Sequence, residues 1–96
     1  METVVRLRAL VRGNVQGVGY RYWAHHTANR LGSVKGYVRN LPDGAVEVEA
    51  ESNDKTVLQA LFHELHVGPT AAQVTAVEAN WEEEVPSRMT GSFRIA

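Results

Sequence analysis

Apolar residues recur along this chain with two different periods, and the order of those periods leaves few possible folds. Residues 5–12 alternate apolar with mostly basic side chains, the period of a strand with one buried face. Residues 20–31 place apolar and small side chains at helical spacing. The expected order is strand, helix, strand, strand, helix, strand and a short apolar end, at about residues 5–12, 20–31, 34–40, 46–51, 57–65, 72–82 and 92–96.

This order predicts an α+β fold, a ferredoxin-like two-layer sandwich of the type βαββαβ plus a short C-terminal strand. Both helices are expected on one face of a mostly antiparallel sheet, because that arrangement buries both kinds of apolar pattern. With 96 residues the chain has the size of one small domain, and no repeat, linker or low-complexity segment divides it. We expect a single domain over residues 1–96.

Residues typical of turns and helix ends lie between the patterned segments. Residues 42–44 (Pro-Asp-Gly) suit the tight turn of a hairpin. One of residues 52–54 (Ser-Asn-Asp) is expected to cap the second helix, and Gly32 to end the first. The alternation of the fourth strand changes phase between Ala76 and Val77, which predicts a bulge there.

Composition and charge exclude several classes of function. Cysteine is absent, so neither thiol catalysis nor a thiolate metal site is possible. The formal charge is −1, so no net positive field draws the molecule to nucleic acid or to anionic lipid. The apolar runs are too short to span a bilayer, and the arginines near the N-terminus do not fit a secretion signal. We expect a cytoplasmic protein without a membrane partner.

Two rows of charged residues are expected on the face of the sheet away from the helices. The first strand carries basic residues and the third carries acidic ones, on the side that we expect to face solvent: Arg6, Arg8, Arg12, Glu47, Glu49 and Glu51. Opposite charges on neighbouring strands can pair. The arginines are therefore interpreted as structural, and no nucleic-acid partner is expected.

The segment GNVQGVGYR, residues 13–21, ends the first strand pattern with glycines and closes on a cation. Main-chain N–H groups in such a loop, at the positive end of the helix that follows, form a pocket for an anion such as phosphate. Gly17 and Gly19 permit positive φ and close approach, and the guanidinium of Arg21 can bond an anion twice. The nucleotide-binding phosphate loop and the dinucleotide motif both need residues that this segment lacks. A flexible connection with an exposed arginine remains the alternative interpretation.

The segment VRGNVQGVGYRYWA closely resembles the acylphosphatase signature, and further motifs extend the likeness over nearly the whole chain. ANRLG is similar to the end of that family's first helix, GYVRNLPDGAVEVEAE to its second and third strands, LHVGPTAAQVTAVE to the run into its fourth strand, and SFRIA to its closing strand. The resemblance implies an enzyme that hydrolyses the carboxyl–phosphate bond of acyl phosphates to a carboxylate and inorganic phosphate. It implies no metal and no cofactor.

The resemblance also implies which residues form the site. Arg21 matches the family's phosphate-binding arginine, and Asn40 matches the asparagine that holds the attacking water. The phosphate cradle corresponds to the Arg21 side chain and to the main-chain amides of Val15, Gln16, Gly17, Val18, Gly19 and Tyr20. The expected partners are an acyl phosphate as substrate and inorganic phosphate as product or inhibitor, and the expected state is a monomer.

The chain departs from the family's pattern at a few positions. Tyr20 stands where phenylalanine is usual, Tyr37 where tryptophan is frequent and Ser52 where glycine is common. The segment LGSVKG is one residue longer than usual. We expect the connection before Gly36, at residues 33–35, to absorb the extra residue, because loops tolerate added length.

Other functions find less support in the residues. The histidines, at positions 25, 26, 63 and 66, lack the spacing of a zinc hydrolase, so no metal site is expected. An RNA-binding domain of this fold would carry aromatic and basic residues on its central strands, but the first strand has arginines without an aromatic residue and the third is acidic. A noncatalytic phosphate- or carbamoyl-phosphate-binding module remains a second candidate, because a cradle serves binding equally well. Asn40 favours the enzyme, since a pure anion receptor has little use for a water-holding amide.

Overall fold

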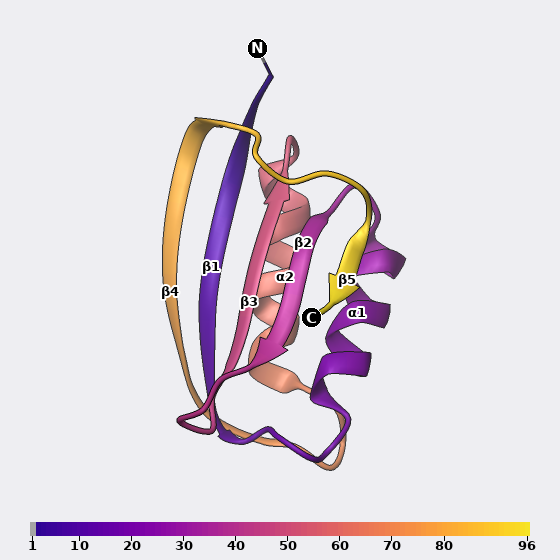
Figure 1. Cartoon of the computed structure of the whole chain (residues 1–96), viewed down its shortest axis with the longest axis vertical. Helices are drawn as coiled ribbons and strands as arrows, with labels where there is room; N and C mark the ends of the chain where they lie inside the picture. Colours follow the sequence, from indigo (N-terminus) through magenta and orange to yellow (C-terminus); the bar gives the residue numbers. More distant parts are fainter. Residues whose placement is uncertain (1) are drawn as a thin grey trace.

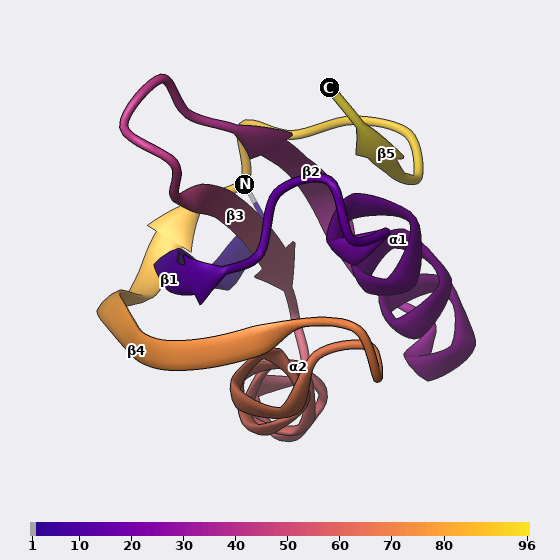
Figure 2. The ribbon, with the colours of Figure 1, turned by 90° about the horizontal axis from the view of Figure 1, so that it is seen from below.

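The computed structural model describes residues 2–96. Its elements are β1 (Thr3–Asn14), α1 (Tyr20–Leu31), β2 (Lys35–Asn40), β3 (Val46–Ser52), α2 (Lys55–Val67), β4 (Gln73–Pro86) and β5 (Phe93–Ile95). The strands form one sheet in the order β4-β1-β3-β2-β5, antiparallel except for the pair β2–β5. Both helices cover the same face of this sheet (Figures 1 and 2), which confirms the predicted sandwich. Neither helix is long and apolar enough to cross a membrane.

The outer strand β4 is longer than the sequence predicted. Its pattern indicated an end at Glu82, but the strand continues to Pro86, which lies opposite Thr3 at the start of β1. The acidic residues 82–84 lie within the strand: Glu82 pairs with Arg6, the register shifts at residues 83 and 84, and Val85 then pairs with Val4. Arg6 of β1 also bonds this extension, through Glu82 and the carbonyl of Pro86.

β4 contains a bulge near the predicted place, but at a different residue. The change of phase placed it between Ala76 and Val77, whereas the register shifts at Thr75, next to Gly13 of β1. An added Cβ on Gly13 would lie 2.1 Å from the carbonyl oxygen of Gln73. The close approach of the two backbones at this glycine accounts for the position of the bulge.

The hydrophobic core lies between the sheet and the two helices. Most of its members come from the three inner strands and from the faces of α1 and α2 that meet the sheet, among them Leu7, Ala9, Val11, Ala24, Ala28, Val38, Val46, Val48, Ala50, Leu58, Leu61 and Leu65. Tyr20, at the start of α1, is buried in this core, and its hydroxyl donates a hydrogen bond of 2.6 Å to the carbonyl of Leu65. This hydrogen bond links the start of α1 to the last turns of α2.

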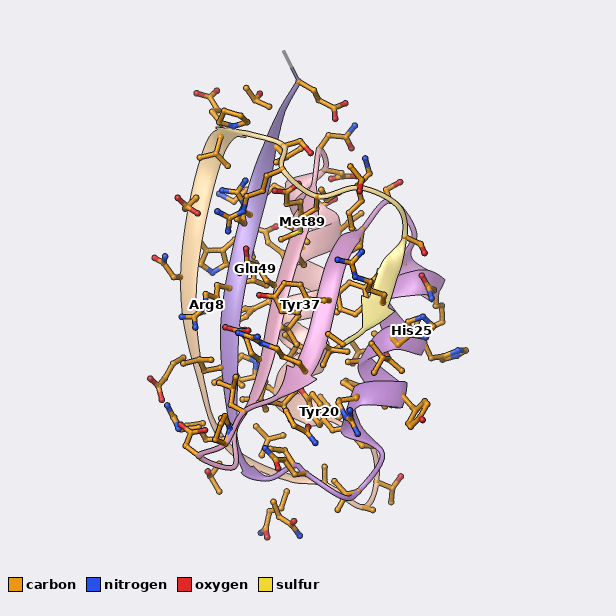
Figure 3. All side chains as sticks on the ribbon, in the orientation of Figure 1. Arg8, Tyr20, His25, Tyr37, Glu49 and Met89 are labelled. Atoms are coloured by element: carbon orange, nitrogen blue, oxygen red, sulfur yellow. The ribbon has the colours of Figure 1, made fainter. Side chains whose placement is uncertain are left out.

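The acidic row of β3 is buried, which corrects the expectation that it faces solvent. Glu47, Glu49 and Glu51 are only 1%, 8% and 1% exposed. They lie on the face of the sheet away from the helices, where Figure 3 shows Glu49 between Arg8 and Tyr37. The segment at 87–92 crosses this face in front of β3 and β2 (Figure 1). β3 is a central strand, so neighbouring side chains and this segment cover its carboxylates.

Arginines from several segments compensate these buried charges. The pairs are Arg6–Glu51 (2.7 Å), Arg8–Glu47 (2.6 Å), Arg39–Glu47 (2.6 Å) and Arg88–Glu49. The predicted pairing of the two rows is confirmed for Arg6 and Arg8, whereas Arg12 pairs with Glu78 and Asp43 instead. Each buried carboxylate has a cationic partner, and these ion pairs offset the free-energy cost of removing the carboxylates from water.

The connection between α1 and β2 is short, residues 32–34. Gly32 ends α1 with φ 76°, and Ser33 takes φ 57°, a left-handed conformation that serine rarely adopts. β2 then begins at Lys35, one residue later than expected, and ends at Asn40 as predicted.

Candidate active site

The loop between β1 and α1, residues 15–19, has the backbone shape that its glycines predicted. Gly17 and Gly19 have φ values of 75° and 82°, in the left-handed region that glycine adopts without strain. An added Cβ on either glycine would meet no atom within 4 Å. These glycines are therefore needed for the conformation of the loop, and the space in front of them is open.

The loop presents main-chain donors that have no partner. Within residues 2–96, the N–H groups of residues 15–20 make no hydrogen bond of normal length and angle. The N–H of Trp23 is the first in α1 to do so, and it donates to the carbonyl of Gly19 at 3.0 Å. Gly19 is the N-cap, no side chain caps the helix, and its first turn contains no acidic residue. With the positive end of the helix dipole, donors arranged in this way can bind an anion.

Arg21, in the first turn of α1, adds a positive charge that no carboxylate neutralises. In the part of the chain that the structure describes, the lysines and arginines without an ion pair are Arg21, Lys35 and Arg94. The Arg21 residue is partly buried. Its guanidinium fork is thus available to bond an anion held by the loop.

The Gln16 side chain fastens the loop to the β2–β3 hairpin. Its amide nitrogen donates hydrogen bonds to the carbonyl oxygens of Leu41, at 2.8 Å, and Ala45, at 2.9 Å. The same two residues close the hairpin, because the N–H of Leu41 donates to the carbonyl of Ala45 at 2.8 Å. Sequence reasoning assigned only the main chain of Gln16 to the site. It missed the side chain, because the acceptors are 25 and 29 residues away.

Asn40 is the last residue of β2 and lies opposite Val46 of β3. The residue is exposed, and no hydrogen bond within residues 2–96 holds its carboxamide. The end of β2 and the loop before α1 lie at the same end of the molecule, the lower end in Figure 1. Seen from below, the loop passes in front of β2 (Figure 2). The structure thus places the predicted site residues at one end: Val15, Gln16, Gly17, Val18, Gly19, Tyr20, Arg21 and Asn40.

Two cavities lie away from this loop. The larger, about 410 Å³, is at the opposite end of the molecule, between the end of α1, the start of β2 and the end of β3, beside Ser33, Lys35 and Ser52. The smaller, about 220 Å³, lies on the open face of the sheet beside Tyr37 and Arg88. Neither is lined by the predicted site residues. The candidate site is therefore the loop itself, with its unpaired main-chain donors, and neither of these cavities.

Two of the histidines, His25 and His66, make local contacts within their own helices. Among the described residues, no group of three or more His, Asp or Glu side chains is arranged to hold a metal ion. His25 is hydrogen-bonded to Asn29 at 3.1 Å, and Nδ1 of His66 lies 2.9 Å from the carbonyl oxygen of Phe62. Both contacts lie within a single helix.

The chain is similar in sequence and in fold to several acylphosphatases. A family model described as acylphosphatase matches residues 7–95. The chain is 54% identical over 79 residues to an acylphosphatase of Thermus thermophilus, a match that covers 82% of this chain and 88% of the relative. It is 47% identical over 91 residues to one of Anaeromyxobacter dehalogenans, covering 95% and 94%. The crystal structure of acylphosphatase from Bacillus subtilis matches with a TM-score of 0.86 and 29% identity, over 96% of this chain and 98% of that chain.

The fold and the loop define a class of protein, an α+β sandwich whose first helix begins at a glycine loop with unpaired main-chain N–H groups. The chain belongs to the acylphosphatase family. It is accordingly an enzyme of the type that hydrolyses acyl phosphates, and the resemblance inferred from the sequence motifs is confirmed.

Proposed function

We propose that the protein hydrolyses the carboxyl–phosphate bond of acyl phosphates by in-line attack of water, without a metal or a cofactor. Arg21 and the main-chain amides of residues 15–20 hold the phosphoryl group, and Asn40 orients the water. The observation that carries this proposal is the run of unpaired N–H groups at residues 15–20, which continues into the helix that bears the unneutralised guanidinium of Arg21.

Binding of the phosphoryl group needs little more than these donors. In phosphoryl transfer, negative charge is spread over three oxygens of the transferring group, and catalysis consists mainly of positioning and electrostatic stabilisation. The loop amides are held in place by the positive-φ glycines and by the bonds of Gln16. Because they are oriented before the substrate arrives, they stabilise the developing charge without reorganising.

The reaction itself needs no general acid. Water attacks phosphorus, the bond from phosphorus to the acyl oxygen breaks, and the electron pair leaves with a carboxylate that requires no proton. Asn40 can orient the water through its carboxamide but cannot accept its proton. An oxygen of the substrate phosphate takes that proton, and the products are a carboxylate and inorganic phosphate. Holding the water in line is therefore the main task of Asn40.

Hydrolysis of a simple aromatic acyl phosphate in the presence of a chelator tests the proposal. We expect the wild-type protein to release phosphate at the same rate with and without the chelator. Asn40→Ala should lower kcat by about 10²–10³-fold, the usual effect of losing a well-placed polar group. Its affinity for inorganic phosphate, measured by competitive inhibition, should stay largely intact. Weaker phosphate binding with a normal kcat would overturn the role given to Asn40.

A noncatalytic phosphate- or carbamoyl-phosphate-binding module of the same fold is the second candidate, because unpaired N–H groups at residues 15–20 also suit a receptor. The exposed and unbonded carboxamide of Asn40 favours the enzyme. Saturable binding of carbamoyl phosphate by a wild-type protein that releases no phosphate would favour the module instead.

The proposal also covers the domain organisation, oligomeric state, location and partners of the protein. We propose one acylphosphatase-like domain over residues 1–96, monomeric and cytoplasmic, without nucleic-acid or membrane partners. The outer strand β4 carries Glu78 and the acidic residues 82–84, whose like charges disfavour pairing of two copies along this edge. Arg6 and Arg8 are engaged with buried carboxylates, which supports a structural role. Light scattering should give the mass of one chain, and neither DNA, RNA nor anionic vesicles should retain the protein.

A further inference from the structure

We infer that the side chain of Gln16 positions Asn40, by fixing the β2–β3 hairpin against the phosphate-binding loop. The inference rests on the proposed function, in which Asn40 holds the attacking water and the loop holds the phosphoryl group. Gln16 would then be a positioning residue that acts through Asn40, in addition to the main-chain amide that it contributes to the loop.

The contacts of Gln16 link the two parts of the site directly. Its amide nitrogen lies 2.8 Å from the carbonyl oxygen of Leu41 and 2.9 Å from that of Ala45, so both of its protons are used. Leu41 follows Asn40 in the chain, and one of the two acceptors therefore belongs to the residue next to the proposed water-holding group. Both bonds are partly buried.

The two carbonyl groups do not depend on Gln16 for a hydrogen bond. The Leu41 carbonyl also accepts from the N–H of Gly44 at 3.2 Å, and the Ala45 carbonyl from the N–H of Leu41 at 2.8 Å. Removing the Gln16 amide therefore leaves neither carbonyl without a donor, and the hairpin keeps its own bonds. What the Gln16 bonds add is the position of the hairpin relative to the loop.

A second contact to the hairpin does not replace this one. Arg12 reaches Asp43 at 3.3 Å, but Asp43 is exposed, and exposed ion pairs are weakened by solvent and salt. Arg12 belongs to β1 and also bonds Glu78, so this pair joins the hairpin to the strands and not to the loop.

The catalytic consequence follows from the geometry of attack. The water must lie in line with the breaking bond, and a misplacement of about 1 Å can cost about 10²-fold in rate. The phosphoryl group is held by main-chain donors of the loop, whereas the water is held by a side chain of the hairpin. A shift of the hairpin therefore affects turnover more than phosphate binding.

The test is Gln16→Met, which keeps the length of the side chain and removes the donor. We expect kcat to fall by about 10- to 100-fold. The inhibition constant of inorganic phosphate should change by less than about twofold, because the main-chain donors and Arg21 remain. Gln59→Met, at an exposed position of α2, is the matched control and should leave both quantities unchanged.

A double substitution separates positioning of Asn40 from a general effect on the site. In an Asn40→Ala background, Gln16→Met should lower kcat by less than about twofold further, because the group on which Gln16 acts has gone. A full and additive loss in that background would overturn the inference. So would weaker phosphate binding at unchanged kcat, which would show that Gln16 shapes the loop alone.

Folding is checked by thermal unfolding of each variant. If Gln16→Met does not fold, Gln16→Asn takes its place, since it keeps the amide but is too short by one methylene to reach both carbonyls, and the same results are expected. A normal kcat in Asn40→Ala would overturn the proposed role of Asn40. A kcat that collapses in Asn40→Ala but is unchanged in Gln16→Met would overturn this inference alone.

Discussion

Arg21 differs from most basic residues of this chain because no carboxylate engages it. Arg6 and Arg8 are committed to buried glutamates, whereas Arg21 stands in the first turn of a helix that has no side-chain cap. A guanidinium in this place can form two parallel hydrogen bonds to a phosphoryl group, and an ammonium cannot.

Arg21→Lys should therefore rescue little. We expect kcat/KM to fall by about 10²-fold or more, nearly as far as in Arg21→Ala, with weaker inhibition by inorganic phosphate in both variants. Steady-state hydrolysis of an aromatic acyl phosphate measures the effect. A lysine variant close to the wild type would show that a point charge is sufficient.

Gly17 and Gly36 both have positive φ, but only Gly36 lies in close contact with neighbouring backbone. At Gly36 of β2 an added Cβ would lie 1.9 Å from the carbonyl oxygen of Glu49, whereas at Gly17 it would meet nothing within 4 Å. Gly36→Ala should lower the free energy of unfolding by about 3 kcal/mol or more, because backbone must move. Gly17→Ala should cost only about 1–2 kcal/mol of conformational strain. Urea unfolding measures both, and equal losses would contradict the distinction.

β3 is the element whose environment most departs from its pattern, because its acidic side is buried. Burial by itself raises the pKa of Glu51, but hydrogen bonds from Arg6, from the N–H groups of Arg88 and Met89 and from the Ser87 hydroxyl outweigh it. The pKa of Glu51 therefore lies below the ordinary value of 4.5. The Glu51 carboxylate therefore binds a proton more readily in the unfolded chain than in the folded one. Its contribution to the free energy of unfolding is complete well above pH 4.5 and is lost as the pH falls through the lower pKa of the folded state.

Glu51→Gln tests this account of β3. At neutral pH we expect the free energy of unfolding to fall by about 3 kcal/mol, because Arg6 loses its buried carboxylate partner and keeps only the exposed Glu82, at 3.3 Å, and the carbonyl of Pro86. Between about pH 5 and pH 3 the variant should lose less stability than the wild type, since one of the titrating groups is gone. Urea unfolding across this range is the measurement, and parallel curves for the two proteins would contradict the role of Glu51.

The last and shortest strand, β5, completes the sheet at the edge next to β2. β5 adds to β2 in parallel, and Phe93 places a side chain that is 1% exposed in the common core. The strand that ends in Asn40 therefore has a neighbour on each side, β3 and β5. A residue near the C-terminus thus contributes to the same core as β1 and both helices.

Phe93→Ala should lower the free energy of unfolding by about 3–5 kcal/mol, a large part of the stability of a domain of this size. Arg94→Ala, at an exposed position of the same strand, should change it by less than about 0.5 kcal/mol. The measurement is urea unfolding followed by circular dichroism. A small effect of Phe93→Ala would mean that β5 is not part of the cooperative core.

Local patterns were sufficient for the order of the elements, the hairpin turn, the end of the first helix, the cap of the second and the glycine loop. Each of these depends on residues close together in the chain, such as Asp54, whose carboxylate caps α2 by accepting from the N–H of Thr56 at 3.0 Å. The end of β4, the place of its bulge and the burial of Glu47 and Glu51 were decided by which segments lie side by side.

Within the site, Gln16 shows the same difference between features that local sequence patterns predict and features that depend on distant contacts. Its main-chain part in the loop follows from neighbouring glycines, and these are visible in the sequence. Its side chain bonds carbonyl groups 25 and 29 residues away, and no local pattern identifies such acceptors. The sequence by itself determined the secondary structure, the loop and the family, because periodicity and backbone preference act over a few residues. The tertiary structure alone decided which charges are buried and which elements hold the site together, because those depend on contacts between distant segments.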